Sequence, residues 1–148
     1  MMVIDTSVFV DLLAPRDQAR HKMAEEIFRL VERLDLAIYA PRLMVIELIS
    51  VLKRAIGIDE LVEEAVGVLD YVNLVGEERI FKEAKRIALK VHPRAVDAYF
   101  IATAKLLGTL LVSNDRLMVR GAREYGVEAY FLMEEHEKLR TRLMKVSP

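Results

Sequence analysis

The chain contains no cysteine, and this absence removes several classes of chemistry at once. Without cysteine there is no disulfide, no cysteine-ligated zinc or iron–sulfur site and no thiol nucleophile. The three histidines, His21, His92 and His136, do not have the spacing of a metal-binding pair. The six glycines form neither GxGxxG nor GxxxxGK, so dinucleotide-binding and P-loop functions lack support. No GxSxG motif indicates a serine hydrolase.

Long apolar runs are also missing, because no stretch reaches the roughly 18 residues that a membrane span needs. Asp5 follows the first residues directly, without a basic and then apolar leader. We therefore expect a cytoplasmic protein with no membrane partner. The net charge of −1 argues against strong non-specific binding to nucleic acid, although it is compatible with a local basic patch.

Short apolar segments alternate with amphipathic helical patterns along the 148 residues. Five segments have the composition of strands: 2–4, 36–40, 71–75, 109–112 and 127–132. Helical patterns cover residues 6–13, 18–34, 41–55, 58–70, 77–91, 94–107 and 134–145. This alternation predicts one α/β domain of three layers, in which a parallel sheet of about five strands lies between helices. The last helix has a thin apolar seam and is a candidate for packing against another chain.

Three acidic residues stand where a predicted strand ends or a predicted helix begins. Asp5 follows the first strand, Asp115 follows the fourth, and Asp97 lies in the first turns of the helix before the fourth strand. Strand ends and helix starts meet at one edge of an α/β sheet, so these three side chains can be neighbours. Each position also suits an ordinary role, either capping a helix or complementing its dipole.

Glu47 is harder to explain as a structural residue. It lies in the middle of the predicted helix 41–55, among residues that are nearly all apolar, and no lysine or arginine is three or four positions away. Burying an unpaired carboxylate costs several kcal/mol. Two structural explanations remain open: a cationic partner from elsewhere in the chain, or a solvated stripe along this helix.

Four carboxylates that converge at one edge of a sheet repel one another unless cations lie between them. Oxygen ligands without cysteine or suitably spaced histidine favour Mg²⁺ or Mn²⁺ over zinc. Such an ion activates water and stabilises charge on phosphate, which is what phosphodiester hydrolysis requires. That reaction needs no side-chain nucleophile.

The same residues resemble the PIN domain family. The resemblance is carried, in order, by VIDTS at residues 3–7, PRLMVIELISVL at 41–52, DAYFIATAKLLGTLLVSND at 97–115 and the final strand. The size and the Asp-Thr-Ser opening look like a VapC-type toxin ribonuclease. The resemblance implies a metal-dependent endoribonuclease whose catalytic and metal-binding residues are Asp5, Glu47, Asp97 and Asp115. Thr6, Ser113 and Asn114 would support these acids.

The resemblance also implies domain limits and partners. Residues 1–132 would form the nuclease domain, and residues 133–148 would form a helical extension of it. A VapC-type toxin implies an RNA substrate, a homodimer and a cognate antitoxin protein. Five arginines are candidate contacts for RNA phosphates: Arg16, Arg42, Arg94, Arg116 and Arg120.

Two other functions are compatible with the same sequence. One is a housekeeping RNA-processing nuclease that has no antitoxin. The other is a PIN-like scaffold that binds RNA or a protein without cutting, although the full set of four acids argues against it. The chain offers no clear fifth acid, which leaves open whether one ion or two would bind.

Overall fold

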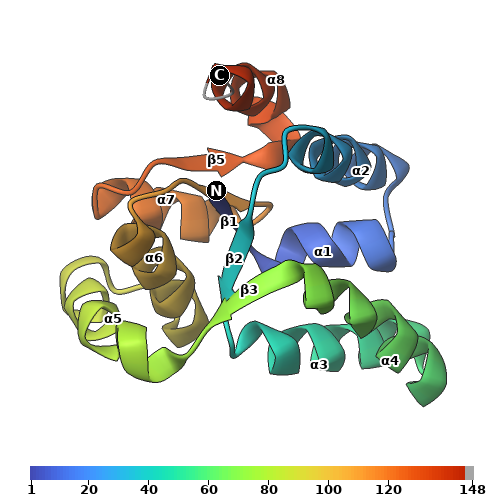
Figure 1. Ribbon diagram of the computed structural model, residues 1–148. Helices are drawn as coiled ribbons and strands as arrows, with labels where there is room; N and C mark the ends of the chain where they lie inside the picture. Colours follow the sequence, from blue (N-terminus) through green and yellow to red (C-terminus); the bar gives the residue numbers. More distant parts are fainter. Residues whose placement is uncertain (146–148) are drawn as a thin grey trace.

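The computed structural model describes residues 1–145, which form a parallel five-stranded sheet with helices on both faces (Figure 1). The strands are β1 (Met2–Ile4), β2 (Ile38–Pro41), β3 (Val72–Val75), β4 (Leu111–Ser113) and β5 (Ala129–Phe131). Their order across the sheet is β3-β2-β1-β4-β5, and every neighbouring pair is parallel. The predicted α/β fold with a parallel sheet of about five strands is therefore confirmed.

The helices form the two outer layers. They are α1 (Thr6–Leu13), α2 (Gln18–Arg33), α3 (Met44–Ile56), α4 (Asp59–Val66), the 3-10 helix η1 (Gly67–Tyr71), α5 (Glu77–Val91), α6 (Ala95–Leu107), α7 (Arg116–Glu124) and α8 (Leu132–Met144). On one face, α6 contacts β1, β2 and β4, α7 contacts β4 and β5, and α5 packs on α6. On the other face, α1 packs against β4 and against α2 and α3 (Figure 1).

The central position of β1 follows from its sequence. Met2, Val3 and Ile4 are all fully buried, as expected for a strand covered on both faces. Because β1 lies between β2 and β4, the chain leaves β1 toward β2 and later returns to β4 on the other side. The carboxyl ends of β1 and β4 therefore border the point where the strand order reverses, which is where α/β sheets usually bind ligands.

Several element boundaries differ from the predicted ones. Pro41 was expected to open a helix but ends β2, because the Arg42 N–H donates to the Val75 carbonyl oxygen (2.8 Å) and continues the β2–β3 ladder. Consequently α3 begins only at Met44, and Glu47 lies in its first turn rather than in its middle. The predicted helix 58–70 divides into α4 and η1 at Gly67, a residue type with low helix propensity.

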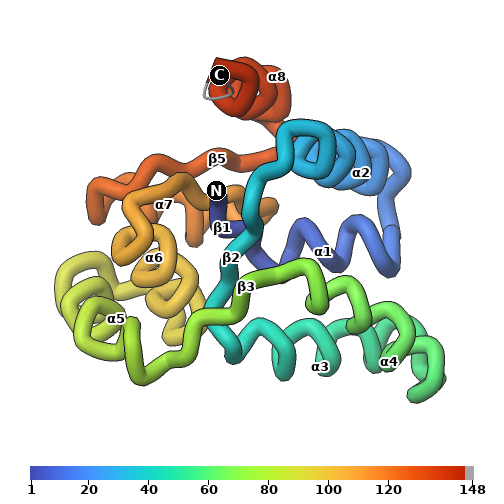
Figure 2. The backbone as a smooth tube through the Cα atoms, viewed as in Figure 1, coloured from blue at the N-terminus to red at the C-terminus, as the bar shows by residue number. Residues whose placement is uncertain are grey.

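The last helix, α8, packs against α2, and Figure 2 shows the two side by side. Leu139 and Leu143 of its apolar seam are buried in the core of this chain, whereas Met144, the third residue of the seam, is 49% exposed. The predicted extension reaches residue 148, but residues 146–148 lie outside the described part of the chain. Within residues 1–145, no helix is long and apolar enough to cross a membrane.

Candidate functional site

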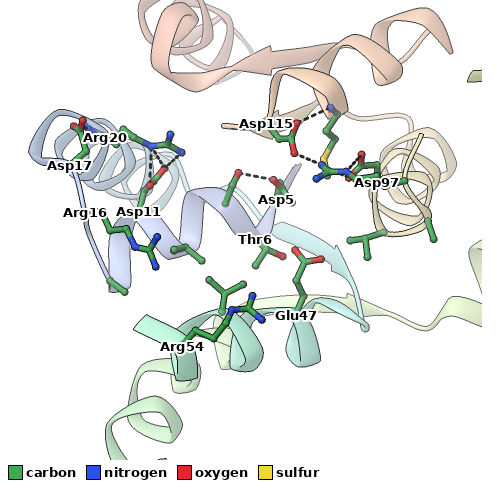
Figure 3. Close-up of a pocket in the computed structure, with 18 residues that line it drawn as sticks. Asp5, Thr6, Asp11, Arg16, Asp17, Arg20, Glu47, Arg54, Asp97 and Asp115 are labelled. Atoms are coloured by element: carbon green, nitrogen blue, oxygen red, sulfur yellow. Dashed lines mark hydrogen bonds and ion pairs between the residues drawn. The ribbon is translucent and has the colours of Figure 1, made fainter. Parts of the chain in front are cut away.

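A cleft opens beyond the carboxyl ends of β1 and β4, and all four predicted acids line it (Figure 3). Asp5 follows β1 and Glu47 belongs to α3; we call these two residues the α1–α3 wall. Asp97 belongs to α6 and Asp115 precedes α7; we call these two the α6–α7 wall. The cleft has a volume of ≈ 890 Å³, which lies within the usual range of ligand sites.

The pairing of β1 with β4 positions Asp5, whose N–H donates to the Val112 carbonyl oxygen (2.9 Å). Asp5 occupies the N-cap position of α1, yet its carboxylate makes no capping hydrogen bond to that helix. Its Oδ2 instead accepts hydrogen bonds from the hydroxyls of Ser7 (2.6 Å) and Ser113 (2.8 Å). Burial raises the pKa of Asp5 to about 6; the two hydroxyls oppose this rise, and the charge of Glu47 adds to it.

On the side of the cleft formed by the α1–α3 wall, Glu47 and the neighbouring Thr6 have side-chain oxygens without a hydrogen-bond partner among residues 1–145. The Glu47 side chain is partly buried and is directed into the cleft (Figure 3), but it has no ion pair or hydrogen bond with any of residues 1–145. The expected alternative, a cationic partner from elsewhere in the chain, is thus not found there. The Thr6 hydroxyl also borders the cleft and is buried without a hydrogen-bond partner in the same residues. A buried hydroxyl left without a partner costs about 1–3 kcal/mol.

The negative charge of the α6–α7 wall is balanced by Arg94. The guanidinium donates to both carboxylate oxygens of Asp97, from Nε (3.0 Å) and from Nη2 (3.1 Å), and Nη2 also donates to Asp115 Oδ2. Burial raises the pKa of Asp97, and the hydrogen bonds and charge of Arg94 oppose that rise. Repulsion between converging carboxylates requires cations between them, and for Asp97 and Asp115 a side chain of this chain supplies that positive charge.

Asp115 also has the structural role that its position suggested. Its Oδ1 accepts hydrogen bonds from the N–H groups of Leu117 (2.9 Å) and Met118 (3.3 Å) and so caps α7. The same carboxylate lines the cleft and contacts Arg94 through its other oxygen. The capping role and a role in the cleft are therefore compatible, since they use different oxygens.

Ser113 connects the two walls. Its hydroxyl donates to Asp5 and accepts a hydrogen bond from the N–H of Asp115 (2.9 Å), so it fixes the position of one acid from each wall. Asn114, the other predicted supporting residue at this strand end, points its side chain elsewhere. Its Nδ2 donates to Asp11 (2.7 Å) and its Oδ1 accepts from the Met133 N–H (3.0 Å), so it links α1 to the start of α8.

Five further polar residues of the cleft were not predicted as site residues from the sequence: Ser7, Asp11, Asp17, Arg20 and Arg54. Ser7 could have been found, because a serine two positions after Asp5 at a helix start can reach its carboxylate. Asp11 is buried and forms a bidentate ion pair with Arg20, in which Nε and Nη2 each donate at 3.1 Å. Nothing in the sequence distinguishes that pair from exposed charges on α1 and α2.

Of the five predicted phosphate contacts, Arg16 and Arg94 line the cleft. The other three pair with glutamates: Arg42 with Glu77 (3.5 Å) and Glu78 (3.9 Å), Arg116 with Glu134, and Arg120 with Glu124 (4.0 Å). Arg54 of α3 joins Arg16 in the cleft (Figure 3). Both side chains are exposed, and neither forms an ion pair with any of residues 1–145.

The chemistry of this donor set fits a hard divalent cation. The acids supply oxygen ligands alone, and on the α1–α3 wall Glu47 and the Thr6 hydroxyl have unmet interactions. Within the described residues, however, no three acidic or histidine side chains are gathered closely enough to hold an ion as they stand. Arg94 occupies the space between the carboxylates of the α6–α7 wall, so binding an ion there requires its side chain to move.

Comparison with known proteins agrees with this arrangement. The PIN domain model matches residues 2–124, which is most of the chain. The chain belongs to the PIN domain family. PIN domains are generally nucleases that use a divalent metal ion.

A similar fold occurs in a solved structure, the crystal structure of PAE2754 from Pyrobaculum aerophilum. The TM-score is 0.62 and the identity 18%, over 97% of this chain and 89% of that chain, so the similarity concerns the fold alone. No curated protein sequence matches the chain. The PIN resemblance expected from the sequence is confirmed at the level of the family.

Proposed function

We propose that this PIN domain is a metal-dependent endoribonuclease that hydrolyses phosphodiester bonds in RNA. The observation that carries the proposal is the convergence of Asp5, Glu47, Asp97 and Asp115 on one cleft, from four separate segments of the chain. Three of these acids have alternative structural partners, but Glu47 has none among residues 1–145. The Glu47 carboxylate is partly buried and is directed into the cleft, where it is available to bind a cation.

The proposed roles follow from these contacts. Asp5, Glu47, Asp97 and Asp115 would provide the oxygen ligands of Mg²⁺ or Mn²⁺. When bound, the ion would activate a water molecule and stabilise negative charge on the phosphate. The hydroxyls of Ser7 and Ser113 hold Asp5 Oδ2 in a fixed orientation, which limits the movement of that ligand.

Two arginines of the cleft could bind the phosphates of the RNA backbone. Arg16 from the loop between α1 and α2 and Arg54 from α3 border the same cleft as the acids (Figure 3). Neither is paired with an acid in the described part of the chain, so both are free to contact phosphates that flank the cleaved bond. These contacts would position the RNA without reading its base sequence.

The activity is tested with a 5′-labelled single-stranded RNA and with an RNA hairpin that carries a long loop. We expect internal cuts in the presence of Mg²⁺ or Mn²⁺ and none with EDTA. RNA that binds but is not cut with either ion would support the scaffold alternative. Removal of nucleotides only from an end would contradict endonuclease activity.

We further propose that the protein is the toxin of a VapBC-type pair, active as a homodimer and inhibited by a cognate antitoxin protein. The support is the Asp-Thr-Ser opening and the resemblance in size to VapC-type toxins. Expression of the chain alone should slow growth of a host cell, and the Asp97→Asn variant should not. Normal growth with an enzyme that cuts RNA in vitro would favour the housekeeping nuclease instead.

A further inference from the structure

Arg94 occupies the part of the cleft where a metal ion would contact the α6–α7 wall. It engages both oxygens of Asp97 and the one oxygen of Asp115 that does not cap α7. Among residues 1–145, Arg94 is the only cationic side chain that forms an ion pair with any of the four acids of the cleft, and it pairs with two of them, Asp97 and Asp115. It therefore supplies positive charge at the place where the proposed function needs an ion.

The two partners of this contact differ in their freedom to move. The Asp97 side chain is only 3% exposed and is fixed in the first turn of α6, whereas the Arg94 side chain is 60% exposed. The guanidinium can therefore swing into solvent or toward the open cleft without disturbing the core. The carboxylates would remain in place, ready for another cation.

We propose that Arg94 is an internal competitor of the divalent ion, so that the ion binds by exchange: the guanidinium leaves Asp97 and Asp115 as the ion arrives. This inference rests on the proposed function. An ion at about 2.1 Å from these oxygens and a guanidinium at its present hydrogen-bond distance would be two cations in direct contact. They exclude one another because each needs the same lone pairs, and their charges repel.

The exchange has two consequences. Without an ion, Arg94 limits the repulsion between the acids, so this wall of the cleft keeps its shape. When an ion binds, the apparent affinity of the protein for that ion is lower than the carboxylates alone would give, because the Arg94 guanidinium must first be displaced. Arg94 is thus a positioning residue for the acids in the ion-free protein and a determinant of metal affinity.

The test is calorimetric titration with Mn²⁺ at about 0.15 M salt, where charges more than about 8 Å apart are largely screened. Four proteins are compared: wild type, Arg94→Gln, Arg94→Lys and Arg54→Gln. Arg54 lines the same cleft but pairs with none of the four acids, so its variant measures the general effect of removing one positive charge.

We expect Arg94→Gln to bind Mn²⁺ at least about fivefold more tightly than wild type. Arg94→Lys, which keeps the charge but loses the two-pronged contact, should lie between them, and Arg54→Gln should stay within about twofold of wild type. Equal or weaker binding by Arg94→Gln would overturn the inference while leaving the metal site intact. An equal gain in Arg54→Gln would also overturn it, because charge alone would then be responsible. If no variant bound Mn²⁺, the proposed function itself would fail.

A second measurement follows the guanidinium directly in the wild-type protein. The Nε–H signal of Arg94, identified by its loss in Arg94→Lys, is observed in nitrogen-15 spectra while Mg²⁺ is added. Displacement predicts that this signal shifts as the ion binds, to the same extent as ion occupancy measured by calorimetry. A signal that stays unchanged at full Mg²⁺ occupancy would contradict the exchange.

Discussion

The two walls of the cleft place the same kind of side chain in the same space but balance its charge differently. On the α6–α7 wall, Arg94 pairs with Asp97 and Asp115, and Asp115 also caps a helix. On the α1–α3 wall, the Asp5 carboxylate accepts hydrogen bonds from two hydroxyls and has no ion pair within residues 1–145, and Glu47 has no ion pair or hydrogen bond with those residues. The difference indicates that an added cation would stabilise the carboxylates of the α1–α3 wall most. On the α6–α7 wall, it would replace the Arg94 guanidinium that is already present.

The largest effect expected from this comparison is the pH dependence of the ion-free protein. Because burial raises the pKa of Asp5 from 3.8 to about 6, the folded state keeps a proton that the unfolded state releases between these values. The free energy of unfolding should therefore fall as the pH rises from about 4 to 6, by up to about 3 kcal/mol, and the Asp5 contribution should then stay constant.

Urea unfolding in EDTA from pH 4 to 8 measures this contribution as the difference between wild type and Asp5→Asn. Since the amide has no proton to lose, Asp5→Asn should gain stability relative to wild type over that interval. A difference that does not change with pH would show that Asp5 titrates normally and that the α1–α3 wall is not strained by its charge.

A slightly smaller effect is expected from metal binding. An ion that binds only the folded state at one hundred times its dissociation constant should stabilise the protein by about 2.7 kcal/mol, or on the order of 5–10 °C in melting temperature. Glu47→Gln should lose most of this gain, because it removes a carboxylate that has no other partner. Glu64→Gln on α4, an exposed acid away from the cleft, is the matched control and should keep it. An equal gain in melting temperature in both variants would show that Glu47 is not a ligand of the metal ion.

On the α6–α7 wall, substitutions should lower stability even without metal. Asp115→Ala loses the cap of α7 and the contact with Arg94, and we expect a loss of about 1 kcal/mol in EDTA. Asp115→Asn keeps a capping oxygen and should recover most of that stability, yet it should not recover RNA cleavage. If Asp115→Asn cut RNA at the wild-type rate, Asp115 would be a helix cap only.

The smallest expected effect concerns the two unpaired arginines. Arg16→Gln and Arg54→Gln should each weaken binding of single-stranded RNA about equally for all sequences, because the proposed contacts of these arginines are to phosphates. Each should also reduce the slope of log affinity against log salt by about 0.7. The measurement uses Asp5→Asn as background, so that the RNA stays intact, and Arg120→Gln as a control outside the cleft. If the slope of log affinity against log salt were unchanged, the RNA phosphates would not contact these arginines.

Much of this site could be predicted from the sequence because it depends on strand order and apolar patterning. Asp5 and Asp115 follow strands that were expected to be parallel, so their proximity followed from the fold class. Glu47 was identified by its apolar surroundings, even though its place in the helix was wrong. The predicted helix start at Pro41 was wrong, because a backbone hydrogen bond between β2 and β3 outweighs the local preference of proline for a helix start.

The charge balance could not be predicted in the same way. The spacing of Arg94 and Asp97 allows a contact within one turn, but the second contact to Asp115 requires α6 and α7 to meet at the cleft. The direction of Asn114 and the pairing of Asp11 with Arg20 likewise depend on tertiary packing. The positions of the acids can thus be predicted from the sequence, whereas the cation between Asp97 and Asp115 cannot.

The central claim is that both walls act together in a metal-dependent nuclease, and cleavage rates of single substitutions test it most directly. Asp5→Asn and Glu47→Gln on one wall, and Asp97→Asn and Asp115→Asn on the other, are compared with wild type on one single-stranded RNA in saturating Mn²⁺. We expect each variant to remain folded, to bind the RNA and to cut it at least about a hundredfold more slowly. Near wild-type cleavage by the variants of either wall would contradict the claim, because that wall would then have no part in the reaction.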